Sequence, residues 1–231
     1  MICRSLVIIS VFCFYGCSLG TNPNDQYREF GEDLNLSDYG NNKVKIQGNV
    51  SKNSFFPMAM GLEWTYKLVY SSNTNGQEDD SLSQIRVKIT EKREIEGKIY
   101  FVFDSYFLPG PQLPKPAFIR KEGENVYTYI GGEEYILYSF SSNKNAWIIP
   151  LFVNHNDTND FNIERTVNTD NTAAFALNDL YYFPSDSAIT GRSEHGWGEI
   201  IEKGLGRARI ESYSMIYGKR VWNLVNLKIT N

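Results

Sequence analysis

A strict alternation of apolar and polar residues constrains this chain more than any other feature. From Leu62 to Tyr70 every second residue is apolar or aromatic, and Glu63, Thr65 and Lys67 lie between them. Successive side chains of a β-strand point to opposite faces, so the pattern predicts a strand with one face buried and one in water. The folded body therefore begins with β structure, shortly after Phe55.

Similar short segments recur along the chain, with turn residues between them. Glu96-Gly97 is typical of a hairpin turn, and Gly204-Leu205-Gly206 is better explained by turns than by a phosphate-binding loop, because strands follow it. Further strands are predicted around residues 85–89, 99–107, 118–120, 126–130, 135–140, 146–150, 161–167, 197–202, 207–217 and 220–229. We expect a mainly β fold with little helix, an antiparallel curled sheet or open barrel (half-barrel) of roughly ten strands.

Two segments leave a helical alternative open. Residues 82–94 end in a charged stretch that suits a helix, although their β-branched residues favour a strand. Ala173 to Leu180 is the segment of the body for which we expect a helical turn or two.

The first 17 residues have the order of charge and hydrophobicity that secretory signal peptides share. Arg4 precedes an apolar segment from Leu6 to Tyr15, and the small residue Gly16 stands directly before Cys17. The apolar segment is too short to cross a bilayer as a helix, which needs about 20 residues. An uncleaved leader, or an ordinary signal peptide cut elsewhere, is the alternative.

All three cysteines, Cys3, Cys13 and Cys17, lie in this first segment. Cleavage after Gly16 would leave one thiol, at the first residue of the mature chain. Exported domains usually carry paired cysteines or none, because a stray thiol is reactive in an oxidising compartment. The pattern predicts export without disulfides, and it excludes a thiolate zinc site or a cysteine nucleophile downstream.

Phe14-Tyr15-Gly16-Cys17 resembles the lipobox of bacterial lipoproteins. The resemblance implies cleavage before Cys17, a diacylglycerol on its sulfur and an acyl group on the new amino terminus. Several acyl chains on one residue give a durable membrane anchor, whereas one chain binds marginally. Ser18, by resemblance to lipoprotein sorting signals, implies the outer membrane of a two-membrane bacterium.

The opening of the body resembles that of an uncharacterised family of β-rich bacterial lipoproteins. The matching residues are Phe55-Phe56-Pro57, Gly61 and Trp64-Thr65-Tyr66, and a later Gly-x-Gly before a closing pair of strands is matched by Gly204-Leu205-Gly206. The resemblance implies a fold and a compartment, the cell envelope, and it implies no activity.

The chain divides into three parts on this evidence: a signal peptide at 1–16, the lipidated cysteine and a flexible tether at 17–53, and a single β-rich domain at 54–231. Residues 18–53 are rich in Asn, Asp, Gly and Ser, and they bury too little apolar surface to offset their ordering entropy. A short added strand from Lys43 to Val50 is the alternative for the end of the tether.

Charge and histidine content exclude some function classes. Without the leader the chain has 22 basic and 27 acidic residues, a net charge of about −5, whereas nucleic-acid binding requires a basic surface. His155 and His195 are the only histidines, and neither has a second histidine or a cysteine nearby to complete a zinc site. No Gly-x-Ser-x-Gly motif accompanies a candidate nucleophile such as Ser193, and no cofactor is predicted.

One polar stretch suggests a metal site. It crowds five oxygen-bearing side chains into seven positions, namely Asn154, Asn156, Asp157, Asn159 and Asp160. Calcium takes about 6–8 oxygen ligands, so a calcium site is one hypothesis for this stretch. The spacing differs from that of an EF-hand loop, and a solvated loop is the alternative.

Aromatic residues are the remaining sign of a ligand. With 15 Tyr and 4 Trp the chain has more than its core requires, so some should face water and bind a sugar, a peptide or a protein. The candidates are Trp197, which lies between two glycines and is expected to be exposed, Trp147 and Tyr129.

The sequence thus favours a membrane-anchored cell-envelope lipoprotein that binds an envelope protein, a glycan or a small ligand and catalyses no reaction. An exported hydrolase with carboxylates drawn from loops is one alternative. A carrier of lipids or other apolar ligands is another, because an apolar-lined half-barrel suits such cargo. A deep apolar cavity would favour the carrier, and carboxylates clustered in a cleft would favour the hydrolase.

Overall fold

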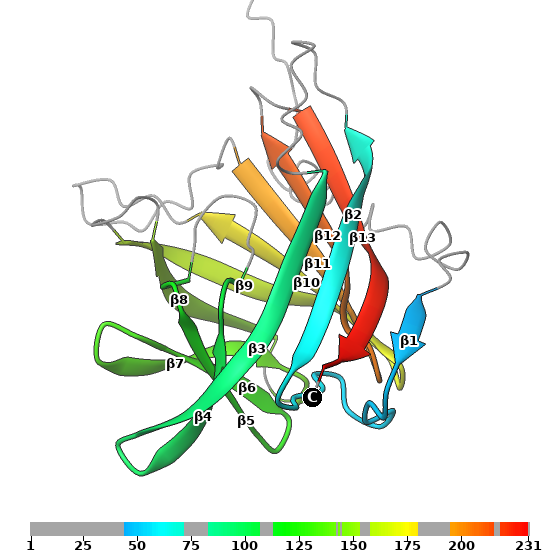
Figure 1. Ribbon diagram of the computed structural model, residues 1–231. Coiled ribbons are helices and arrows are strands. Elements are labelled where there is room, and N and C mark those ends of the chain that lie inside the picture. Colours follow the sequence, from blue (N-terminus) through cyan, green and yellow to red (C-terminus); the bar gives the residue numbers. More distant parts are fainter. Residues whose placement is uncertain are drawn as a thin grey trace, which may run out of the picture.

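The computed structural model describes residues 44–71, 83–106, 113–141, 143, 145–152, 158–179, 195–214 and 218–230. The regular elements in these ranges are strands (Figure 1): β1 (Lys45–Gln47), β2 (Leu62–Ser71), β3 (Gln84–Ile95), β4 (Lys98–Phe103), β5 (Ala117–Glu122), β6 (Asn125–Ile130), β7 (Glu133–Ser139), β8 (Ala146–Phe152), β9 (Thr158–Asn168), β10 (Thr172–Asp179), β11 (His195–Glu202), β12 (Gly206–Ser214) and β13 (Gly218–Ile229). Among the described residues there is no helix of the length and hydrophobicity needed to span a membrane.

The strands form one curled sheet that nearly closes into a barrel (Figure 1). Neighbours follow the order β7-β6-β5-β4-β3-β2-β13-β12-β11-β10-β9-β8, and all of these pairs are antiparallel. The sheet is thus two series of hairpins, joined where the first long strand, β2, pairs with the last strand, β13. The predicted fold class, a mainly β antiparallel curled sheet or open barrel, is confirmed.

Both helical alternatives are resolved in favour of strands. Residues 84–94 of this segment belong to β3, which pairs with β2 and then with β4 across the Glu96-Gly97 turn. The helical turn expected at Ala173–Leu180 is wrong, because β10 pairs with β9 on one side and with β11 on the other. Phe175 and Leu177 reach the core on alternate residues, and this burial outweighs the helix propensity of the alanines.

The inside of the barrel is filled by alternate residues of the strands. On β2, Leu62, Trp64 and Tyr66 are buried in the core, as the alternation predicts. The predicted exposure of the other face is wrong at Glu63 and Thr65, which are each 5% exposed, and the alternation also fails further along, since Tyr70 is 52% exposed. A register shift between Val221 and Trp222 of the neighbouring β13 falls at this level of the sheet, and such irregularities re-aim side chains.

The path of antiparallel strands ends at β7 and β8, which meet at a seam without pairing. The Arg165 guanidinium of β9 ties the connection between them: it donates to the carbonyl oxygens of Ser139 (3.1 Å) and Ser141 (2.6 Å) and to Oδ1 of Asn145 (2.8 Å). Pro150 lies in β8, where an edge strand tolerates the missing amide donor.

A segment before β2 closes one end of the barrel, and we name residues 44–61 the strap. It begins with β1, which pairs in parallel with residues 226–228 of β13 and confirms the added strand considered as an alternative for this stretch. The strap then crosses the end of the barrel (Figure 1): the carbonyl oxygen of Ser54 accepts from the Gly204 amide (2.8 Å), and the Phe55 ring stacks on Phe140 with centroids 4.7 Å apart.

Glycine is required where the strap turns into β2. Gly61 has a φ of 72°, and a Cβ there would lie 1.8 Å from the carbonyl oxygen of Thr230. Its own carbonyl oxygen accepts from the Thr230 amide at 3.0 Å. The end of β13 therefore packs directly on the backbone of the strap, which makes the strap part of the folded domain.

Candidate functional site

The most chemically distinctive feature of the described interior is a cluster of five polar side chains in the core. We call it the buried polar cluster, and its members are Tyr66 (β2), Tyr106, Tyr138 (β7), Glu199 (β11) and Arg207 (β12). Glu199 faces inward because it shares one face of β11 with the core residues Trp197 and Ile201. The cluster thus joins strands from both halves of the sheet.

The members of the cluster bind one another. Nη2 of Arg207 lies 2.9 Å from Oε1 of Glu199, and their side chains are 2% and 0% exposed. The Tyr138 hydroxyl donates to the other carboxylate oxygen of Glu199, and the hydroxyl oxygens of Tyr106 and Tyr138 are 2.7 Å apart. The Tyr66 hydroxyl donates to the backbone carbonyl of Arg207 at 3.0 Å. The guanidinium of Arg207 lies 4.3 Å from the centroid of the Tyr106 ring.

Burial is the largest single influence on the pKa values of this cluster. It raises the pKa of Glu199, and the attraction of Arg207 and the hydrogen bond from Tyr138 offset part of the rise. Burial also raises the pKa of Tyr66, Tyr106 and Tyr138 well above the ordinary value. For Arg207 burial acts in the opposite sense, but attraction to Glu199 and the tyrosines outweighs it, so its pKa is raised and its charge is retained.

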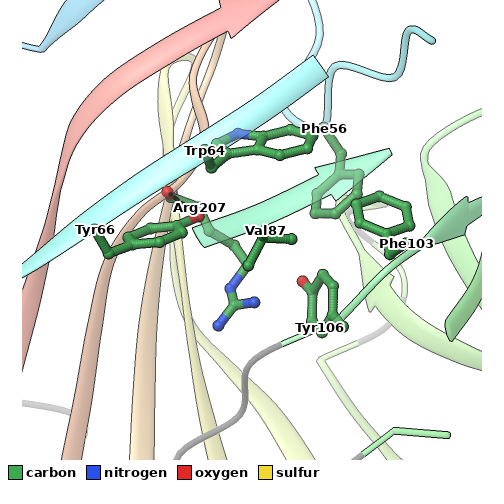
Figure 2. A pocket seen from close by; sticks show the side chains of 7 residues that line it. All are labelled: Phe56, Trp64, Tyr66, Val87, Phe103, Tyr106 and Arg207. Atoms are coloured by element: carbon green, nitrogen blue, oxygen red, sulfur yellow. Dashed lines mark hydrogen bonds between the residues drawn. The ribbon is translucent and has the colours of Figure 1, made fainter. Parts of the chain in front are cut away.

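A small cavity lies beside Arg207 (Figure 2). It is lined by Phe56, Trp64, Tyr66, Val87, Phe103, Tyr106 and Arg207. The centre of a water molecule can occupy about 10 Å³ of it, which is close to the smallest space that holds one water. The cluster is therefore a packed polar core, and this cavity has no room for a substrate or a lipid chain.

Glycine places Arg207 at the start of β12. Gly206 has a φ of 77°, and a Cβ on it would lie 3.2 Å from Nε1 of Trp64. This close approach lets the indole Nε1 of Trp64 donate to the carbonyl oxygen of Leu205 at 2.8 Å. The turn predicted at Gly204-Leu205-Gly206 thus brings β12 against β2, with Arg207 directed inward.

A second ionic network lies on the opposite face of the sheet, over β4, β5 and β7. Glu134 accepts from the Tyr100 hydroxyl (2.6 Å), Nη2 of Arg120 (2.7 Å) and Nζ of Lys98 (2.9 Å), and also from Nε of Arg120. The hydrogen bonds from Arg120 above all, with those from Tyr100 and Lys98, lower the pKa of Glu134 from 4.5 to about 2, although burial opposes them. Both carboxylate oxygens of Glu134 already accept hydrogen bonds, so the network is better suited to holding β4, β5 and β7 together than to binding a ligand.

This network predicts a loss of stability in acid. A carboxyl whose pKa is lower in the folded state stabilises the fold above its unfolded pKa, and the contribution disappears as the pH falls from about 4.5 towards 2. Replacing Glu134 with Gln should cost about 1–2 kcal/mol of unfolding free energy at pH 7. Urea titrations from pH 7 to 2 should show a shallower acid loss for the variant than for the wild type; parallel curves would contradict the assignment.

One contact has the composition of a serine–lysine dyad. Nζ of Lys121 (β5) lies 2.7 Å from Oγ of Ser54, and burial lowers the pKa of Lys121. The Ser54 hydroxyl donates to the carbonyl oxygen of Phe56 at 2.9 Å, so its proton points away from the lysine. A base must accept that proton, and here Lys121 donates instead. The contact fastens the strap to β5.

The aromatic candidates lie in different environments. Trp197 is 4% exposed and its ring packs against Phe161 at 5.5 Å, so the expectation that Trp197 is exposed is wrong. Its glycine neighbours lie within β11 and do not form a turn. Trp147 is also buried, whereas Tyr129 is half-buried and packs edge-on against Tyr100.

The predicted calcium stretch lies partly outside the described residues, which include neither Asn154, Asn156 and Asp157 nor His155. Asn159 and Asp160 are neighbours in β9 and pair through the backbone with Leu151 and Pro150 of β8. Adjacent strand residues point to opposite faces, so these two do not share a site. No group of three or more His, Cys, Asp or Glu suited to a metal occurs among the described residues. Cys17 is outside them, as is Ser193, and of His195 only the backbone is described.

The buried polar cluster was not predicted from the sequence. The available signal was Glu199, a charged residue in register with two apolar ones, Trp197 and Ile201, on a predicted strand. A charge on the buried face of a strand requires a partner, so this register indicates a buried ion pair. The partner itself, Arg207, cannot be chosen without the strand pairing.

Comparison with known proteins gives one result. No protein-family model matches the sequence, and neither does any curated protein. A crystal structure at 2.70 Å resolution of a protein from Parabacteroides distasonis ATCC 8503, provisionally described as a lipoprotein, is similar over 79% of this chain and 100% of that chain, with 14% identity and a TM-score of 0.41. A likeness of this size identifies neither a family nor a function.

Proposed function

We propose that this chain is a lipid-anchored protein of the bacterial cell envelope, whose barrel binds a protein, glycan or small ligand on its outer surface and catalyses no reaction. The observation that carries the binding role is the filled interior. The polar side chains of the buried polar cluster bind one another, and the cavity beside them holds about one water. A partner would therefore bind to the outer surface of the barrel.

The anchor is supported by the leader. A short apolar segment ends in Gly16-Cys17, and no cysteine follows it in the remaining 214 residues. Acyl chains on that sulfur would hold the domain at a membrane. Ser18 supports the outer membrane as the location.

The two alternatives find less support. An apolar carrier needs a cavity of several hundred Å³, as small-molecule pockets generally do, and the cavity beside Arg207 is far smaller. A hydrolase needs an accessible acid or nucleophile. Glu199, the acid of the buried polar cluster, is bound by Arg207 and Tyr138.

The anchor is tested by Cys17→Ala. We expect this variant to move from the membrane fraction to the soluble fraction, because it lacks the sulfur that would carry the lipid. Cys13→Ala, within the leader that is removed, is the matched control and should stay with the membrane. Mass spectrometry of the mature protein should find Cys17 at the amino terminus with added lipid mass; an unmodified or earlier amino terminus would contradict the proposal.

A further inference from the structure

We infer that the strap end of the barrel is a membrane-docking surface, which rests on the phospholipid headgroups of the bilayer that carries the anchor. The inference relies on the proposed lipid anchor for the nearness of a bilayer. The surface is formed by side chains that the strap leaves in water and by one neighbouring turn. We call it the base patch, and its members are Ile46, Lys52, Phe55, Met60 and Lys203.

The strap differs from the rest of the chain in composition. Residues 44–61 contain two lysines and no acidic residue, in a chain with 27 acids overall. Part of its apolar content is left in water: Ile46 is 50% exposed and Met60 is 42% exposed. Phe55 is half-buried, with one side of its ring stacked on Phe140. Aliphatic and aromatic groups of this kind insert at the boundary between headgroups and acyl chains.

Lysines accompany these apolar groups. Nζ of Lys203, in the β11–β12 turn, lies 5.2 Å from the centroid of the Phe55 ring, and Lys52 is exposed on the strap. An ammonium group beside apolar side chains matches the phosphate level of a bilayer, where each cation near an anionic surface adds to binding.

Acidic groups at this end limit the positive charge. Glu122 is bound by Nη1 of Arg120 at 2.7 Å, and burial raises the pKa of Glu202. Glu124 and Asp170 lie in exposed turns nearby. The net charge of this end is therefore small, and insertion of Ile46 and Met60 rather than attraction to anionic lipid should dominate the docking.

The covalent chain brings this end to the bilayer. Only 26 residues separate Cys17 from Val44, the first described residue, and they join the fold at the strap. Even fully extended they reach about 90 Å, so the base patch is confined near the membrane at high effective concentration. That confinement raises the occupancy of a contact that the free protein also makes.

The test uses the full mature chain with Cys17→Ser, purified without lipid, and sedimentation with sucrose-loaded vesicles. The vesicles are phosphatidylcholine with about 30 mol% phosphatidylglycerol. We expect measurable co-sedimentation, which Ile46→Ser and Met60→Ser each lower by about three- to tenfold through loss of inserted apolar surface. Ile148→Ser on β8 is the matched control, because Ile148 is 52% exposed and lies outside the strap; it should bind like the parent.

Two results would overturn the inference: no co-sedimentation of the parent, or an equal loss for Ile148→Ser. Unchanged melting temperatures establish that the exposed substitutions leave the fold intact. Because the protein tested carries no lipid, the result does not depend on lipidation. The lipid anchor is decided by the mass at Cys17, and membrane docking is decided by the vesicles.

Discussion

Glu199→Ala is expected to lower the unfolding free energy by about 3–5 kcal/mol, because it removes the carboxylate that balances the buried charge of Arg207. The pair is 2.9 Å apart with both side chains at most 2% exposed, so water cannot take over the role of the carboxylate in the folded state. Urea unfolding followed by tryptophan fluorescence measures the loss.

The size of this effect distinguishes a missing charge from a missing hydrogen bond. Tyr138→Phe removes one donor to Glu199 and keeps the ion pair, so its expected cost is about 1–2 kcal/mol. The double variant Glu199→Leu, Arg207→Met replaces the pair with apolar side chains, and it should recover most of the loss. A cost below about 1 kcal/mol for Glu199→Ala would show that the core tolerates the unbalanced charge.

Phe56→Ala is expected to cost about 3–5 kcal/mol, as large-to-small substitutions of buried aromatic residues do. Phe56 is 2% exposed, and its ring centroid lies 5.6 Å from that of Tyr138 and 6.5 Å from those of Trp64, Phe103 and Tyr106. Losing it would enlarge the cavity beside Arg207, since Phe56 forms one of its walls (Figure 2).

The adjacent phenylalanine is the control. Phe55 is half-buried and stacks on Phe140, so Phe55→Ala should cost about 1 kcal/mol. Thermal or urea unfolding of the two variants gives the comparison. Equal losses of unfolding free energy would mean that Phe56 contributes no more to the core than the half-buried Phe55 does.

Much of the fold was predictable because it follows from local rules. The alternation in β2 has the period of a strand, and the Glu96-Gly97 turn needs two positive φ angles, which its residues adopt at 51° and 75°. β10 was missed because an alanine-rich segment suits a helix when considered alone. Only its pairing with β9 and β11 decides between the two structures.

The site was less predictable, because it depends on contacts distant in sequence. Tyr66 and Arg207 meet although 141 positions separate them, and no local pattern links them. The exposed Trp197 was inferred from flanking glycines, which are usually turn residues. In the structure these glycines continue β11, and the indole between them packs in the core. Glycine content alone does not distinguish a turn from a strand interior.

The parallel pairing of β1 with β13 has a practical consequence for experiments on living cells. Lys45 pairs with Asn226 and Gln47 with Lys228, so the two ends of the folded region are immediate neighbours. A reporter or affinity handle fused behind β13 would therefore stand beside the point where the tether joins the fold and compete with the tether for space. A circular permutant that joins these ends and opens a hairpin elsewhere would present such a fusion without that crowding.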